Sequence, residues 1–472
     1  MRFLAGTALA LAVASQLLAG EAVGRLVASK EPGWPQWRGP RRDGICDETG
    51  LLQSWPDGGP KLLWTASGLA KGYSSPIIAR GTLYITGDAG DELRIFALDL
   101  DGKLKWTGKN GASWKRSYPG ARASCAYDDG GCPPNGGQLG SLPAAGKLHP
   151  LAASGRIFHM NAHGRVACLD AATGQEVWAV DTLERFQGKT IFWGLSECLL
   201  VDGPRVIVVP GGRKALVAAL DKKTGETVWA SEPLPFERAE RFGGGSLPSP
   251  VREFDSAGYA SPILFELGGR RHIVGYASRH AFGADADTGK LLWTFPMPTT
   301  WEVLASMPAL YKDAVFVTGP DGRGGKLLRV HVEREPVAGD GRGVRVEEVW
   351  TSEMDTCHGS VVFVGDRLYG SWYRHFNGLG CVDAETGKTL YKTNALVKGS
   401  ILYADGRLYY LSERGVMALL KPTAAGFEFA GRFSLTDGRR SDVWAHPVIF
   451  DGRLYLRYHD DLRCYDIKRT AP

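Results

Sequence analysis

A short phrase, Asp-x-x-Thr-Gly-x-x-x-Trp, recurs along the chain and restricts its fold more than any other feature. Clear copies span residues 170–178, 221–229 and 285–293; a copy at 383–391 ends in Tyr, and a shorter version spans 99–106. Asp and Thr side chains can bond the backbone of a turn, and Gly supplies the positive φ that a short hairpin requires. Each copy therefore predicts strand, turn and strand, and their return predicts one repeating fold rather than several domains.

Each repeat closes on an aromatic residue. On the outer strand of a propeller blade such a ring fills the gap between adjacent sheets, buries a large apolar face and docks one blade on the next. Eight positions fit this role: Trp64, Trp106, Trp178, Trp229, Trp293, Trp350, Tyr391 and Phe433. We therefore predict an all-β fold, an eight-bladed β-propeller of four-stranded antiparallel blades, with seven blades as the alternative.

A second pattern precedes the turns: an apolar strand, a turn that contains Gly, and another apolar strand. It is found at residues 75–85, 361–369, 401–409 and 447–455, and the last copy has no closing aromatic strand after Asp466. Residues 61–66, which include Lys61-Leu-Leu-Trp64, can supply that strand from the N-terminal side. We expect a single propeller over residues 61–470, closed by this strand and preceded by an N-terminal extension over residues 23–60.

One interval breaks the rhythm of the repeats. The separation between Trp106 and Trp178 is much longer than that between Trp64 and Trp106, so an insertion lies within it. Its Gly, Pro and Asn content predicts a loop over about residues 128–147 on a face of the propeller. Two segments flank this loop as candidate first strands of the blade, 121–127 and 148–152, and the sequence leaves the choice open.

The first 22 residues have the pattern of an export signal. A short basic start, Met1-Arg2-Phe3, leads into a mostly apolar stretch, and small residues at Gly20 and Ala22 favour cleavage after Ala22. Glu21 stands where a lipoprotein would need Cys. The interpretation is a cleaved signal peptide and a periplasmic or secreted chain. An uncleaved anchor is the alternative, although the stretch barely reaches the roughly 20 residues that a membrane span needs.

Composition favours the same fold class and excludes one class of partner. With 62 Gly, 26 Pro, 14 Trp and 16 Tyr, the chain is rich in turn formers and aromatic residues. The net charge of +5 comes from 56 Lys plus Arg against 51 Asp plus Glu. So small a net charge on a chain of this size implies no nucleic-acid partner. No segment after residue 22 is apolar enough to span a membrane. A self-closed ring has no edge that demands a partner, so we expect a monomer.

The eight cysteines show no zinc-ligand spacing. Cys168, Cys381 and Cys464 occupy equivalent places before hairpin turns, and we interpret them as small buried packing residues. Cys125 and Cys132 lie near each other in a loop-like stretch and are the best candidates for a disulfide in an exported chain.

The recurring phrase resembles the pyrroloquinoline-quinone (PQQ)-like β-propeller repeat. The resemblance extends from Trp34 to Lys468, and the opening Trp34-Pro-Gln-Trp37-Arg38-Gly39-Pro40 is similar to the start of many exported bacterial members. That family has two main kinds. One comprises periplasmic quinoprotein dehydrogenases, which oxidise alcohols or sugars with PQQ and a calcium ion in the propeller funnel. The other comprises non-catalytic propellers, such as the scaffold of the outer-membrane β-barrel assembly machinery.

The dehydrogenase kind implies groups that can be sought in the sequence. Its alcohol-oxidising members carry a disulfide between adjacent cysteines beside the cofactor, and this chain has no Cys-Cys pair. They also hold calcium with a funnel carboxylate and amide, and use a separate Asp as base. Glu197, near the start of an inner strand, is the candidate carboxylate, but no complete set is found. We expect no catalytic residues, no metal site and no resident cofactor, with PQQ and calcium kept for the dehydrogenase alternative.

Residues at the starts of the inner strands should form any ligand site, because these starts converge on one end of the central channel. The candidates are Tyr73, Arg122, Trp193, Glu197, Tyr259, His358, Lys398 and Trp444. Such a mixture suits a sugar, an extended peptide or a quinone, although packing or a solvated loop is the commoner role of each residue alone. We expect a non-catalytic binding or scaffolding module of the cell envelope, with an envelope protein, a peptide or a glycan as partner. The alternatives are a PQQ-dependent alcohol or sugar dehydrogenase and, less favoured, a polysaccharide-binding propeller.

Overall fold

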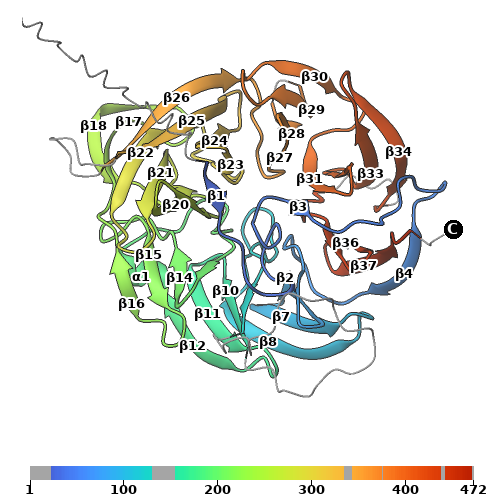
Figure 1. The fold of residues 1–472 in the computed structure, drawn as a ribbon. Coiled ribbons are helices and arrows are strands. Elements are labelled where there is room, and N and C mark those ends of the chain that lie inside the picture. Colours follow the sequence, from blue (N-terminus) through green and yellow to red (C-terminus); the bar gives the residue numbers. More distant parts are fainter. Residues whose placement is uncertain (1–22, 130–154, 334–342, 375, 437–441, 470–472) are drawn as a thin grey trace, which may run out of the picture.

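Eight antiparallel sheets surround a central channel in the computed structural model (Figure 1). The structure describes residues 23–129, 155–333, 343–374, 376–436 and 442–469. This arrangement confirms the eight-bladed β-propeller and excludes the seven-bladed alternative. In blades 1 to 7 successive hairpins carry the chain from an innermost strand at the channel to an outermost strand at the rim. Within the described residues the one helix is α1 (Thr182–Phe186).

The first four blades contain the following strands, given from the channel outwards. Blade 1 has β5 (Ile77–Ala79), β6 (Thr82–Ala89), β7 (Glu92–Asp99) and β8 (Leu104–Ala112). Blade 2 has β9 (Ala126–Asp128), β10 (Arg156–Met160), β11 (Arg165–Asp170) and β12 (Glu176–Asp181). Blade 3 has β13 (Leu200–Asp202), β14 (Arg205–Val208), β15 (Ala218–Asp221) and β16 (Thr227–Ala230). Blade 4 has β19 (Ile263–Leu267), β20 (Arg270–Tyr276), β21 (His280–Asp285) and β22 (Leu291–Pro296).

The last four blades repeat this order. Blade 5 has β23 (Ala309–Tyr311), β24 (Ala314–Gly319), β25 (Gly324–Val332) and β26 (Val344–Ser352). Blade 6 has β27 (Val362–Val364), β28 (Arg367–Trp372), β29 (Gly378–Asp383) and β30 (Thr389–Thr393). Blade 7 has β31 (Gly399–Ala404), β32 (Arg407–Ser412), β33 (Val416–Pro422) and β34 (Phe427–Ser434). Blade 8 has β35 (Val448–Phe450), β36 (Arg453–Tyr458), β37 (Asp461–Asp466) and β4 (Lys61–Ala66).

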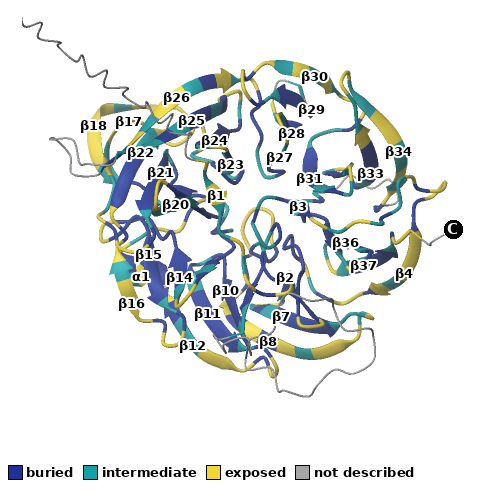
Figure 2. Cartoon of the chain, viewed as in Figure 1, coloured by how far each residue is buried: buried dark blue, intermediate teal, exposed yellow. Residues whose placement is uncertain are grey.

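Burial falls from the channel to the rim (Figure 2). The inner strands of each blade lie between two neighbouring sheets, so both of their faces are buried and their residues form short continuous apolar runs. The outermost strands β8, β16, β30 and β34 consist almost entirely of exposed and half-buried residues. The core is therefore a set of layers between blades rather than one central core.

The recurring hairpin turn docks blades 1, 2, 3, 4 and 6 against the blade before each of them. In blade 2, Asp170 Oδ1 accepts hydrogen bonds from the backbone N–H and the hydroxyl of Thr173, and Gly174 has a φ of +72°. The Trp106 ring of blade 1 lies on this glycine, and its Nε1 donates to the carbonyl of Ala171 at 3.1 Å. The same indole bond joins Trp64 to Leu100, Trp178 to Lys222 and Trp350 to Ala384. The turn and the aromatic residue of the motif are thus parts of one contact between blades.

The ring is closed by a strand from the N-terminal side. β4 pairs antiparallel with β37, with Ala66 opposite Leu462 and Lys61 opposite Asp466. The last blade therefore combines three strands from the end of the described chain with one from its beginning, as the sequence predicts. This pairing removes the free sheet edge that an open ring would leave between blade 8 and blade 1.

Residues 23–60, here called the N-terminal segment, add short strands to three blades. β1 (Arg25–Leu26) pairs with β19, β2 (Gly33–Trp34) with β5, and β3 (Ile45–Cys46) runs parallel to β31. All three pair near the C-terminal ends of these innermost strands, and the segment lies across the middle of the ring (Figure 1). The sequence predicts an extension here but gives no sign of its path.

The N-terminal segment contacts every blade of the ring. Its partners, in blade order, are Ala79, Tyr127, Cys198, Glu266, Lys312, Val361, Tyr403 and Asp451. Because these contacts come from all eight sheets, the segment ties the inner ends of the blades together.

Outside the eight sheets, a two-stranded hairpin joins blade 3 to blade 4. It consists of β17 (Pro235–Glu240) and β18 (Ser246–Phe254), and both strands are mostly exposed. Within the described residues no helix is long and apolar enough to cross a membrane.

The long interval of blade 2 is described in part. β9 pairs with β10 and lies at the end of the first of the two candidate strands, 121–127. Residues 148–152 and nearly all of the predicted loop at 128–147 lie outside the described residues, as do residues 1–22. The loop and the signal peptide remain predictions.

Candidate functional site

The eight candidate residues all lie just before the innermost strand of a blade. They therefore gather at the end of the channel where these strands begin, which we call the channel mouth. Every blade except blade 5 contributes at least one of them.

Tyr73, His358 and Trp444 form an aromatic cluster at the mouth. The centroid of the Trp444 ring lies 5.0 Å from that of Tyr73 and 5.1 Å from that of His358. Tyr73 Oη donates to Asp442 Oδ2 at 2.7 Å, and Asp442 Oδ1 lies 3.2 Å from His459 Nε2. These contacts lower the pKa of Asp442, and burial together with the carboxylate raises the pKa of Tyr73, which stays a neutral donor.

Trp193, Tyr259 and Arg122 form the adjoining part of the mouth. The centroids of the Trp193 and Tyr259 rings are 6.1 Å apart, and the backbone N–H of Trp193 donates to Tyr259 Oη at 3.4 Å. Arg122 Nη1 donates to the carbonyl of Gly120 at 2.6 Å, and its guanidinium lies 5.1 Å from the Trp114 ring centroid. Burial lowers the pKa of Arg122 to about 10, so this side chain stays a cation at neutral pH.

Lys398 extends the mouth on blade 7. Its Nζ lies 3.3 Å from Glu413 Oε1 and 3.9 Å from the centroid of the Tyr373 ring. Burial, reinforced by the Lys398 charge, lowers the pKa of His358 to about 3. The His358 ring is therefore neutral throughout the physiological range.

Glu197 is not exposed to the channel mouth. Its side chain is buried, Oε2 accepts a hydrogen bond from the Val209 N–H at 3.0 Å, and no described residue donates to Oε1. Burial raises the pKa of this carboxyl to about 8, while the nearby charge of Arg42 opposes the shift. Calcium needs several convergent, ionised or carbonyl oxygens, and a buried carboxyl held by its own blade does not fit that set.

Two arginines of the N-terminal segment close the channel beneath the mouth, and the sequence did not point to them. Arg38 Nη2 donates to the carbonyls of Val361 at 2.6 Å and Asp43 at 2.8 Å. Arg42 Nη2 donates to the carbonyl of Cys198 at 2.7 Å. Burial lowers the pKa of each guanidinium to about 10, so two cations are fixed inside the ring.

His446 connects Arg38 of the N-terminal segment to the channel mouth. Its Nε2 lies 3.0 Å from the carbonyl oxygen of His358, and its Nδ1 lies 3.4 Å from Arg38 Nη1. Burial and the Arg38 charge lower its pKa to about 3, so the ring donates through Nε2 and accepts through Nδ1. The neutral His446 side chain thus joins the Arg38 guanidinium to the backbone at the mouth.

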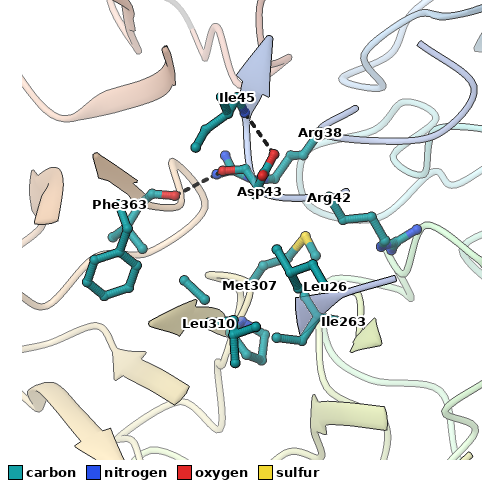
Figure 3. A pocket seen from close by; sticks show the side chains of 12 residues that line it. Leu26, Arg38, Arg42, Asp43, Ile45, Ile263, Met307, Leu310 and Phe363 are labelled. Atoms are coloured by element: carbon teal, nitrogen blue, oxygen red, sulfur yellow. Dashed lines mark hydrogen bonds between the residues drawn. The ribbon is translucent and has the colours of Figure 1, made fainter. Parts of the chain in front are cut away.

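A cavity of about 90 Å³ lies beside the N-terminal segment (Figure 3). Arg38 and Asp43 line one side, and Leu26, Met307 and Phe363 are among the apolar residues opposite. The volume has room for a few water molecules.

Exposed aromatic side chains concentrate on the loops at the mouth end. Among the described residues, five aromatic side chains are strongly exposed: Tyr118 at 50%, Phe192 at 54%, Phe242 at 40%, Trp301 at 40% and Phe429 at 41%. The first four lie on connections between an outermost strand and the next innermost strand, whereas Phe429 lies on the rim strand β34. Clusters of exposed apolar side chains mark interaction surfaces in soluble proteins.

Cys168, Cys381 and Cys464 are buried among the strands. Cys125 is buried in blade 2, and Cys132 lies outside the described residues, so their disulfide remains a prediction. Among the residues that the structure describes, no three His, Cys, Asp or Glu side chains are grouped so that they could hold a metal ion.

The fold and the mouth define an eight-bladed β-propeller with aromatic and cationic side chains at one end of its channel. Residues 133–323 match the family model described as outer membrane protein assembly factor BamB, in agreement with the resemblance seen in the sequence. No curated protein matches the chain.

Several solved structures share the fold. BamB from Moraxella catarrhalis aligns with a TM-score of 0.53 and 14% identity, over 87% of this chain and 98% of that chain. Quinohemoprotein alcohol dehydrogenase from Comamonas testosteroni aligns with a TM-score of 0.57 and 13% identity, over 94% and 82%. The computationally designed Ika8 protein aligns with a TM-score of 0.53 and 11% identity, over 86% and 100%. At these identities the likeness shows the fold alone, and a shared fold does not decide between a binding protein and an enzyme.

Proposed function

We propose that this chain is a non-catalytic periplasmic or secreted propeller that binds an envelope partner through the channel mouth and the loops around it. The observation that carries the proposal is the gathering of Tyr118, Phe192, Phe242 and Trp301 at one end of the ring. Exposed aromatic side chains supply most of the energy of many binding surfaces. The match to the BamB family model favours a protein partner in the envelope.

The polar groups of the mouth support a binding role rather than a reaction centre. Tyr73 donates to Asp442, Lys398 pairs with Glu413, and the Glu197 carboxyl is buried. Side chains that are held by hydrogen bonds and ion pairs to one another form a rigid surface for binding. The N-terminal segment lies across the channel beneath this surface. A PQQ-dependent dehydrogenase is the alternative that the likeness to quinohemoprotein alcohol dehydrogenase keeps open.

Site-specific photo-crosslinking tests the proposal. A benzophenone amino acid in place of Tyr118, at the mouth, should link the exported chain to a defined envelope protein in its native cells. The same group in place of Leu104, which is at least as exposed but lies on the rim strand β8, should give no such product.

A cofactor titration tests the dehydrogenase alternative. The purified chain is mixed with PQQ and calcium, tryptophan quenching reports binding, and dye reduction with alcohols and sugars reports turnover. Tight binding with turnover would overturn the proposal in favour of the dehydrogenase, whereas mouth-specific crosslinks without turnover support it.

A further inference from the structure

We propose that an acidic polysaccharide binds beside the channel mouth, on a surface that joins exposed aromatic rings to a cationic pocket. The inference rests on the proposed binding role and adds the chemical class of a ligand, at a place outside the channel. Six side chains carry it: Phe192, Phe242 and Trp301, called the aromatic ledge, and Lys189, Arg213 and Arg252, called the cationic pocket.

The aromatic ledge is continuous across three loops. Phe192 precedes blade 3, Phe242 lies at the tip of the β17–β18 hairpin, and Trp301 follows blade 4. The Phe192 and Phe242 rings are stacked with centroids 5.6 Å apart, and the Phe242 and Trp301 rings meet edge to face at 5.4 Å. Rings that are at least 40% exposed yet in contact with one another offer a ready apolar platform.

The hairpin that carries Phe242 is fixed in place. Arg238 of β17 pairs with Glu302 at 2.5 Å and with Glu253 of β18 at 2.9 Å, so it joins the hairpin to the loop of Trp301. At the tip, the Gly243 N–H donates to the carbonyl of Thr300 at 3.2 Å. The ledge is therefore preorganised, which reduces the conformational entropy lost on binding.

The cationic pocket lies between the base of the same hairpin and the loops of blade 3. Lys189, Arg213 and Arg252 line it, and none of the three pairs with a carboxylate among the described residues. Glu253 also lines the pocket, but its charge is balanced by Arg238 at 2.9 Å. Glu237 of β17 lies opposite Arg252, but no ion pair joins the two side chains. The pocket thus presents a net positive charge, which is complementary to a carboxylate or another anion.

Ledge and pocket share two segments of the chain, the loop before blade 3 and the β17–β18 hairpin. Lys189 and Phe192 are three residues apart, at most about 10 Å of extended chain. Arg252 and Phe242 belong to the same hairpin. A ligand that covers both must therefore carry apolar faces and negative charges at short intervals along one chain. A polysaccharide of uronic acids does so, because the C–H faces of pyranose rings pack on aromatic rings and the carboxylates pair with guanidinium groups.

An extended acidic peptide fits this surface less well. Peptides that join a sheet need backbone N–H and C=O groups along a free strand edge. In the described sheet β18 pairs with β17 alone, and it contains Pro248 and Pro250, which have no N–H to donate. The edge of β18 is therefore a poor template for a peptide strand. Binding on this surface has to use the side chains of the aromatic ledge and the cationic pocket.

Binding of labelled oligosaccharides to the exported chain tests the inference by fluorescence anisotropy. An oligogalacturonate of about six residues should bind at least about tenfold more tightly than maltohexaose of the same length, and the affinity should fall as sodium chloride rises from about 0.05 M to about 0.5 M. The triple substitution Lys189→Gln, Arg213→Gln and Arg252→Gln should weaken binding about tenfold or more. The pair Phe192→Ala and Trp301→Ala should do the same.

Matched controls lie on other parts of the ring. Exposed lysines of the hairpin turns, Lys103, Lys223 and Lys388, replaced together by Gln, and Phe429→Ala at the rim should leave affinity unchanged. Three results would overturn the inference: no binding of the uronate, equal binding of maltohexaose, or tighter binding of a polyglutamate peptide that depends on the same six residues. If crosslinks at Tyr118 persist in any of these cases, the polysaccharide site alone fails and the proposed function stands.

Discussion

Glu197 shows how burial changes the chemistry of a single side chain. In an unfolded chain its carboxyl has a pKa near 4.5, and in the folded protein the pKa is about 8. Between these values the folded state holds a proton that the unfolded state releases, so raising the pH favours unfolding. The loss in the free energy of unfolding begins near pH 4.5, grows through neutral pH and reaches its full value above about pH 8.

Replacing Glu197 by Gln should remove this cost. The amide oxygen can still accept the Val209 N–H, and Gln carries no charge to desolvate. We expect the variant to gain on the order of 3 kcal/mol in the free energy of unfolding at pH 7, with little change at pH 5. Urea unfolding at pH 5, 7 and 9 measures the difference, with Glu226→Gln on an exposed turn as control. A loss of stability that is equal at all three pH values would show that the ionised carboxylate is needed.

The sequence located the mouth residues but not their partners. Strand starts could be read from the repeats, so the positions of Tyr73, Trp444 and Lys398 before innermost strands follow from the blade count. Their partners Asp442 and Glu413 come from other loops of the ring, and a single sequence does not report contacts between distant loops. The sequence makes Glu197 only a candidate for a funnel carboxylate, because its place before the strand can be predicted but the direction of its side chain cannot.

The hairpin turn and the ring that covers it act as one element. Gly174 has a φ of +72°, and a Cβ there would lie 2.4 Å from the Trp106 ring. Gly174→Ala should therefore cost about 1 kcal/mol for the backbone and a further 1–3 kcal/mol or so for the displaced indole. Urea unfolding of the variant should show this loss, together with a red shift of tryptophan fluorescence.

Gly406→Ala is the matched control for that turn. Gly406 has nearly the same φ, +76°, but open space where the Cβ would lie. Its replacement should cost about 1 kcal/mol, the backbone part alone. Equal losses in the two variants would show that contact with the preceding blade does not contribute.

At the scale of elements, the sequence predicts what repeats and misses what does not. The phrase with Asp, Gly and a final aromatic residue returns in five blades, because their turns solve the same docking problem, and the aromatic residues of the outermost strands complete the count of eight. The strands β1, β2 and β3 have two residues each, too short for any alternation of apolar residues. Their pairing partners lie far along the chain, so the path of the N-terminal segment could be found only from the structure.

Across the whole molecule, two devices hold the ring together. The β4–β37 pairing closes the circle, and the N-terminal segment contacts all eight blades at the inner ends of their strands. The first device removes a free edge, whereas the second adds contacts within a ring that is already closed. They should therefore fail differently when they are removed.

Two truncated chains separate these devices. A chain that begins at residue 57 keeps β4 and lacks most of the N-terminal segment; we expect a monomer with a lower free energy of unfolding, because β1 to β3 and the two buried arginines are lost. A chain that begins at residue 67 also lacks β4, which exposes the edge of β37 to other chains. Light scattering after size exclusion should then show association that grows with concentration, and a synthetic peptide of residues 59–68 should reverse it by restoring the closing strand. If both chains remain monomeric and unfold at the same urea concentration, edge protection by β4 is not what keeps the ring closed.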